Sequence, residues 1–104
     1  MKSLWRTFFG FSDEGDNETF AHAMGRARHL LEIQNYEDAC RILKFADRYQ
    51  DAEGLYLYGW CCWRGQGVVE DAAKAVKLWK KSAALGYQPA KTRCEEIKDF
   101  INSI

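Results

Sequence analysis

The chain has 104 residues with equal numbers of acidic and basic side chains, so its formal net charge is zero. A chain of this length forms one domain with one modest core. Zero net charge provides no bulk attraction to nucleic acid or to an anionic membrane. No run approaches the ~20 apolar residues of a membrane span, and the N-terminal segment lacks a signal-peptide pattern. We therefore expect a cytoplasmic protein with no nucleic-acid partner and no membrane span.

The four cysteines do not have the spacing of a metal site. Cys40, Cys61, Cys62 and Cys94 form neither a C-x-x-C pair nor a cluster with histidine. Adjacent helical residues point about 100° apart, so Cys61 and Cys62 are poorly placed to chelate one ion. We expect reduced thiols that pack as small apolar side chains, and no metal or other cofactor.

Helical periodicity recurs along the chain, which predicts an all-α fold. An aromatic leader and acidic linker, residues 1–17, precede the first helix, and Asp16 or Asn17 is expected to cap it. The first two helices are expected at 18–33 and 36–49. The two-residue break between them predicts an antiparallel helix hairpin.

A second hairpin is expected from helices at 52–64 and 71–85. Gly65 and Gly67 supply positive φ values where the chain leaves the third helix, and Asp71 is placed to cap the fourth.

A single closing helix is expected after the second hairpin. Gly86 terminates the fourth helix, and Pro89 suits the first turn of a fifth. The residues expected to face inward from this helix are Ala90, Cys94, Ile97 and Ile101.

Two segments of the chain resemble each other with a period of about 36 residues. The sequence N-Y-E-D-A-C-R-I-L-K-F-A, residues 35–46, parallels E-D-A-A-K-A-V-K-L-W-K-K-S-A, residues 70–83. The second unit closely resembles the Sel-1-like repeat. Its matching positions are Gly59, Gly65, Gly67, Val68, Asp71, Lys74, Ala75, Trp79, Ala83, Ala84 and Gly86.

The first unit lacks the glycine loop and is similar to the related tetratricopeptide repeat. Its matching positions are Ala27, Leu30, Tyr36, Ala39, Leu43 and Ala46. The resemblance implies a short right-handed α-solenoid, an α-α superhelix of two antiparallel hairpins with a C-terminal capping helix. In that organisation residues 18–50 form a degenerate tetratricopeptide-like repeat, 51–86 the Sel-1-like repeat and 87–104 the cap. The resemblance also implies a non-catalytic adaptor or scaffold.

Aromatic residues that the core pattern does not use define a candidate partner-binding surface. Tyr56, Trp60 and Trp63 share one face of the third helix, beside Arg64. Such residues are enriched among binding hot spots. The tetratricopeptide register adds three residues to the same concave surface: Met24, Arg28 and Leu31. Two interpretations stay open, because Trp60 and Trp63 either line a groove or fill space against the first or fifth helix.

The aromatic leader has three competing roles. Its apolar residues are Trp5, Phe8, Phe9 and Phe11. They either cap the apolar end of the first hairpin, lie in the protein's own groove, or engage a partner or a membrane surface.

No catalytic motif stands out, so we do not expect an enzyme. The expected function is a protein–protein interaction module that binds a peptide or protein on its concave aromatic surface. One alternative is a dedicated inhibitor, such as a bacterial immunity protein that masks a cognate toxin. Another is a small-molecule-binding protein or enzyme accessory subunit. A homodimer that stacks the apolar ends of two copies is a further alternative.

Overall fold

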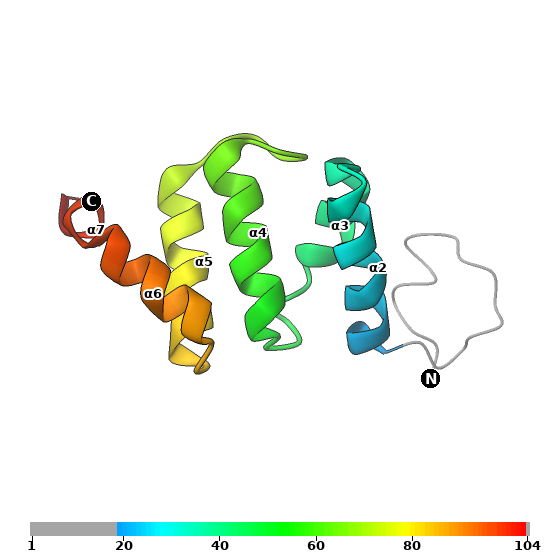
Figure 1. Ribbon diagram of the computed structural model, residues 1–104, viewed down its shortest axis with the longest axis horizontal. Coiled ribbons are helices and arrows are strands. Elements are labelled where there is room, and N and C mark those ends of the chain that lie inside the picture. The colour runs from blue at the N-terminus through cyan, green and yellow to red at the C-terminus, as the bar shows by residue number, and fades with distance from the viewer. Residues whose placement is uncertain (1–18, 104) are drawn as a thin grey trace, which may run out of the picture.

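The computed structural model describes residues 19–103, and this part of the chain is all-helical (Figure 1). It contains six helices and no strand, which confirms the prediction of an all-α protein. The predictions for the leader and linker, residues 1–17, lie outside the described residues. The helices are α2 (Phe20–Glu32), α3 (Tyr36–Leu43), α4 (Ala52–Arg64), α5 (Ala72–Ala84), α6 (Gln88–Glu96) and α7 (Lys98–Ser103).

Thr19 caps the first described helix, α2. Its hydroxyl accepts a hydrogen bond from the His22 N–H at 3.1 Å, and its backbone is extended. The predicted cap at Asp16 or Asn17 is therefore wrong. Asp, Asn and Thr can all cap a helix, so residue type alone does not locate its start. In the structure the helix begins at Phe20, which is buried directly after Thr19.

The connection between α2 and α3 is a tight turn closed by hydrogen bonds. Gln34 adopts a left-handed conformation with φ of 62°. This allows the Asn35 N–H to donate to the Leu30 carbonyl at 2.8 Å, the bond that ends many helices. The Asn35 side chain then accepts from the Asp38 N–H and caps α3. The break predicted at Gln34 and Asn35 is present and is one residue longer, because α2 ends at Glu32 and Ile33 is its C-cap.

Helix α3 is shorter than predicted, because it ends at Leu43 instead of continuing to Tyr49. The N–H groups of Phe45 and Ala46 donate to carbonyls three residues earlier, at 3.1 and 2.9 Å. This is the hydrogen-bond spacing of a tighter 3₁₀ turn and not of an α-helix. Turns continue to Gln50, whose φ of 51° reverses the chain before α4.

Helices α4 and α5 begin and end close to the predicted residues. The carboxylate of Asp51 caps α4, and that of Asp71 caps α5 by accepting the Lys74 N–H at 3.0 Å. Gly65 and Gly67 have φ values of 70° and 79°, as predicted for the loop between these helices.

The predicted closing helix is interrupted and forms two helices, α6 and α7. Gly86 has the expected positive φ, and Pro89 lies in the first turn of α6. The interruption is at Ile97, whose backbone leaves the helical region while its side chain is buried against the core. Ala90 is also buried and Cys94 is half-buried, whereas the side chain of Ile101 lies outside the described ones.

Successive helices pack on one another in chain order. Figure 1 shows α2 and α3 at one end, α4 and α5 in the middle and α6 and α7 at the other end. The interface between α4 and α5 is the most extensive, and that between α3 and α4 is smaller. The core runs through these interfaces, and its largest fully buried side chains are Trp79, Met24, Ile42, Leu43 and Leu55.

Candidate partner-binding surface

Helix α4 has two different faces, and both carry aromatic side chains. Leu55 and Tyr58 are buried in the core. Tyr56, Trp60 and Trp63 are half-buried on another side of the helix. A rotation of about 100° per residue explains the division, because positions 56 and 58 point to nearly opposite sides. The structure thus places the three predicted aromatics together at the surface side of α4.

Trp79 of α5 is the fully buried centre of this aromatic cluster. Its ring centroid lies 5.1 Å from that of Trp60 and 5.3 Å from that of Trp63. Tyr56 meets Trp60 edge to face, with 6.4 Å between the centroids. These are favourable distances for aromatic pairs. The tryptophans therefore support one another across the interface between α4 and α5.

Gly59 provides the space that Trp79 occupies. A Cβ at position 59 would lie 2.7 Å from Cδ1 of the Trp79 indole, which is too close for any real side chain. The approach lets Nε1 of Trp79 donate a hydrogen bond to the Tyr56 carbonyl at 3.1 Å. The glycine thus determines where the cluster forms.

Arg93 of α6 is the cation at the centre of the cluster. Its guanidinium carbon lies 4.6, 5.0 and 4.8 Å from the ring centroids of Trp60, Trp63 and Trp79. Its Nε is buried and has no hydrogen-bond partner within residues 19–103, while Nη1 lies 3.6 Å from a Glu96 carboxylate oxygen. The tryptophan faces are therefore the main surroundings of this charge.

A second cation, Arg64, lies over the same tryptophan. Its guanidinium carbon is 4.4 Å from the Trp60 ring centroid, and the residue is exposed to solvent. Trp60 thus has two guanidinium groups within cation–π range. One of them, from Arg93, was not anticipated from the sequence, because no spacing rule relates α6 to a residue 33 positions earlier in α4.

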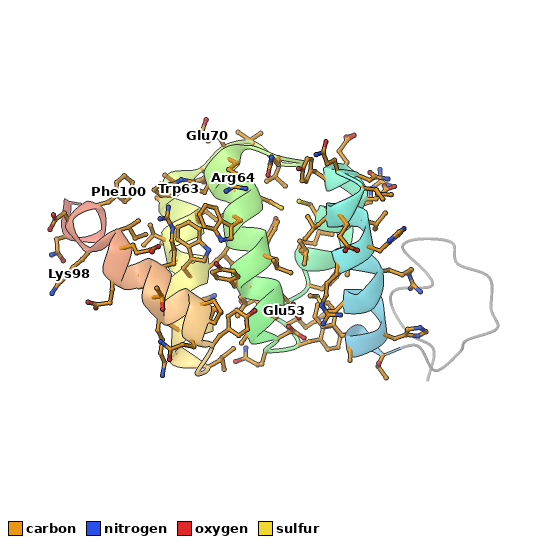
Figure 2. The ribbon with its side chains drawn as sticks, in the orientation of Figure 1. Glu53, Trp63, Arg64, Glu70, Lys98 and Phe100 are labelled. Atoms are coloured by element: carbon orange, nitrogen blue, oxygen red, sulfur yellow. The ribbon has the colours of Figure 1, made fainter. Side chains whose placement is uncertain are left out.

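The C-terminal helices cover part of the predicted surface. Phe100 of α7 packs edge to face on Trp63, with 5.3 Å between ring centroids; Figure 2 labels Phe100 on the terminal helix and Trp63 on α4. Tyr87 lies 5.3 Å from Tyr56 by the same measure. Trp63 therefore packs against the closing helices, one of the two arrangements left open by the sequence. Trp60 keeps a partly exposed edge.

The three residues expected from α2 have different environments. Met24 is fully buried, so its assignment to the binding surface is wrong. Its thioether packs beside Gly54, where a Cβ would lie 3.3 Å from the sulfur. Leu31 is half-buried against the core. Arg28 is exposed and forms an ion pair with Glu53 at 2.7 Å, and the hydrogen bonds of this pair raise the pKa of the arginine.

The cysteines pack as the sequence predicts. Cys40, Cys61 and Cys62 are buried, and Cys94 is half-buried. The pKa of the Cys40 thiol is raised, mainly by a hydrogen bond with Cys61 and secondly by burial. Burial raises the pKa of the Cys62 and Cys94 thiols. Within residues 19–103, no three cysteine, histidine or acidic side chains come together as a potential metal site.

Comparison with known proteins yields no match to a family model or to a solved structure. The resemblance to Sel-1-like repeats therefore stays a prediction from the sequence. None of the helices in the described part combines the length and the apolar character needed to cross a membrane.

Proposed function

We propose that this protein is a non-catalytic interaction module, built as a short Sel-1-like solenoid, that binds a peptide or protein segment on the side of α4 bearing Tyr56, Trp60 and Arg64. The observation that carries the proposal is the half-buried Trp60 ring with two arginine side chains against it, one of them, Arg64, exposed. Rigid aromatic area beside guanidinium groups is the composition of binding hot spots.

The chemistry of this surface suits recognition of a polypeptide. A guanidinium stacked on an aromatic ring keeps its N–H donors directed outward in its own plane. Arg64 is exposed and can therefore donate to a backbone carbonyl or a carboxylate while Trp60 contacts an apolar side chain. The combination of a flat ring and a fork of donors favours a peptide over a purely apolar ligand.

Tyr56, Trp60 and Arg64 follow one another at spacings of four residues, so the surface runs parallel to the axis of α4. Figure 2 shows Arg64 at one end of this helix and Glu53 at the other, where Glu53 pairs with Arg28 of α2. The 13 residues of α4 span about 20 Å, the length of roughly six residues of extended peptide. A short linear segment is therefore the ligand that fits best.

The test is an affinity capture from native cell extract with tagged full-length protein, followed by mass spectrometry. The binding variant is Arg64→Glu, which changes an exposed side chain and leaves the buried parts of the cluster in place. The matched control is Arg48→Glu, the same charge reversal at an exposed residue outside the surface. We expect a partner that is captured by the wild type and Arg48→Glu and lost with Arg64→Glu.

Circular dichroism of both variants establishes that they fold. A partner retained by folded Arg64→Glu and by folded Trp60→Leu would contradict this assignment. The identity of a captured partner separates a scaffold from an inhibitor such as a toxin-immunity protein. Light scattering of the free protein tests the homodimer, which predicts a mass twice that of the chain.

A further inference from the structure

A groove lies on the side of α4 that faces away from Tyr56 and Trp60. Its largest part is a cavity of about 340 Å³ between the end of α3, α4 and α5. The floor is formed by three buried apolar or aromatic side chains, Leu55, Tyr58 and Leu78. A neighbouring cavity of about 220 Å³ shares Tyr58 and reaches the loop after α4 at Val68. The two cavities adjoin, because Lys44 and Tyr58 line both, and we refer to them together as one groove.

Lysines surround this groove. Lys74, Lys77 and Lys81 follow one another at spacings of three and four on α5, so they lie along one face of that helix. Lys44, at the end of α3, borders both cavities. Among the described residues, the larger cavity is also lined by the acidic Asp47, and the smaller one by Glu37 and Arg41. Because the whole chain has zero net charge, this excess of positive charge is a local feature.

Among the three lysines of α5 that line the groove, only Lys81 forms an ion pair with a residue in 19–103. Lys81 forms an exposed ion pair with Asp47 at 3.0 Å. The ammonium of Lys74 lies 5.2 Å from the ring centroid of Tyr58, and Lys77 forms no ion pair with any residue in 19–103. Burial raises the pKa of the Tyr58 hydroxyl, so this side chain stays neutral beside the lysines. The groove is therefore apolar at its floor and cationic at its rim.

We propose that this lysine groove, defined by Lys44, Lys74, Lys77 and Lys81 over Leu55, Tyr58 and Leu78, binds an acidic peptide segment that carries apolar side chains between its carboxylates. Apolar side chains fill the floor, and carboxylates pair with the lysines at the rim. A nucleic acid is less suitable, because the floor has no exposed aromatic face for base stacking and the chain has no overall positive charge.

This inference goes beyond the function proposed above, because the groove and the surface around Trp60 lie on different sides of α4. With both surfaces in use, the protein contacts two partners at once. Each surface has its own variants, so the failure of one proposal leaves the other intact.

The test is a fluorescence-anisotropy titration of the full chain against a labelled peptide in which Glu and Leu alternate. The groove variant is Lys74→Glu/Lys77→Glu. The matched control is Lys80→Glu/Lys91→Glu, two exposed lysines that do not line either cavity. We expect the groove variant to raise Kd by about tenfold or more, and the control variant to leave Kd unchanged. Added salt should weaken binding to the wild type.

Equal weakening by the two double variants would overturn the proposal, because it would show attraction to the general surface. Equally tight binding of a peptide with Gln in place of Glu would also overturn it. Tighter binding of single-stranded poly-uridine, lost in the groove variant, would assign the groove to nucleic acid instead. The Arg64→Glu variant should bind the acidic peptide like the wild type, which keeps this result separate from the proposed function.

Discussion

The two helix pairs of this protein, α2–α3 and α4–α5, have the same topology but are held together differently. Between α4 and α5, a glycine faces a buried indole: Gly59 receives Trp79, which also donates a hydrogen bond to a backbone carbonyl of α4. The pair α2–α3 has no indole: it buries the aliphatic side chains of Met24, Ile42 and Leu43 beside small ones, Ala23, Ala27 and Ala39.

This difference indicates which helix–helix interface tolerates fewer changes in side-chain shape. An indole that fills the space left by a missing Cβ accepts few substitutions at either residue. Small side chains leave more ways for two helices to adjust. The pair α4–α5 should therefore be the more sensitive to single changes, and four measurements test this from the largest expected effect to the smallest.

Removal of the central indole should have the largest effect. Trp79→Ala deletes a fully buried side chain and its hydrogen bond to Tyr56. We expect a loss of about 3–5 kcal/mol in the free energy of unfolding, a large part of the stability of a domain of this size. Urea denaturation followed by circular dichroism measures it. A loss below about 1 kcal/mol would show that the cluster is not the centre of the core.

A single methyl group at the crossing should have the next largest effect. Gly59→Ala places a Cβ against Trp79, and we expect a loss of about 2 kcal/mol. The control is Gly25→Ala in α2, where no atom lies within 4 Å of the added Cβ. That change should stabilise the protein by about 0.5–1 kcal/mol, because alanine favours a helix interior over glycine. The same sign for both variants would refute the contrast between the two helix pairs.

The second hydrogen bond between α5 and α4 should contribute less. The hydroxyl of buried Ser82 donates to the Ala52 carbonyl at 2.6 Å. Ser82→Ala removes this bond with almost no change in volume, so we expect a loss of about 1 kcal/mol. Thermal unfolding by calorimetry is sufficient to detect it. An unchanged melting temperature would show that the indole alone orders this interface.

The ion pair that connects the two helix pairs should have the smallest effect. Arg28 and Glu53 are 50% and 32% exposed in their side chains. Solvent screens such a pair, so Glu53→Gln should cost less than about 0.5 kcal/mol. The loss should disappear at high salt concentration. A larger effect that persists in high salt would mean that this contact, and not the core, joins the pairs.

Much of the fold follows from local sequence signals. Helical periodicity located the main helices, and Gly65, Gly67 and Gly86 marked turns because their φ values are positive. The end of α3 and the interruption at Ile97 were not predicted. Both depend on which side chain is buried against another helix, and periodicity within one segment does not contain that information.

The candidate surface was predictable in part. The spacing of Tyr56, Trp60 and Trp63 placed them on one side of α4, as observed. Arg93 was missed because its partners lie in α4 and α5, outside any local pattern. Met24 was misassigned because the repeat register indicates which side of α2 it occupies but not how close α4 lies. Contacts between distant segments are the part that requires three-dimensional coordinates.

The loop after α4 has a practical consequence for labelling the protein. A Cβ on Gly67 would lie 2.6 Å from the carbonyl carbon of Tyr36, and the Cys40 thiol lies 3.5 Å from the Gln66 carbonyl. This loop is thus held against the other helix pair, and extra residues there would separate the two pairs. The turn at Gly86 has open space around it. A label there still has to preserve the turn, because the Tyr87 N–H donates to the Ser82 carbonyl and the Tyr87 ring packs on Tyr56.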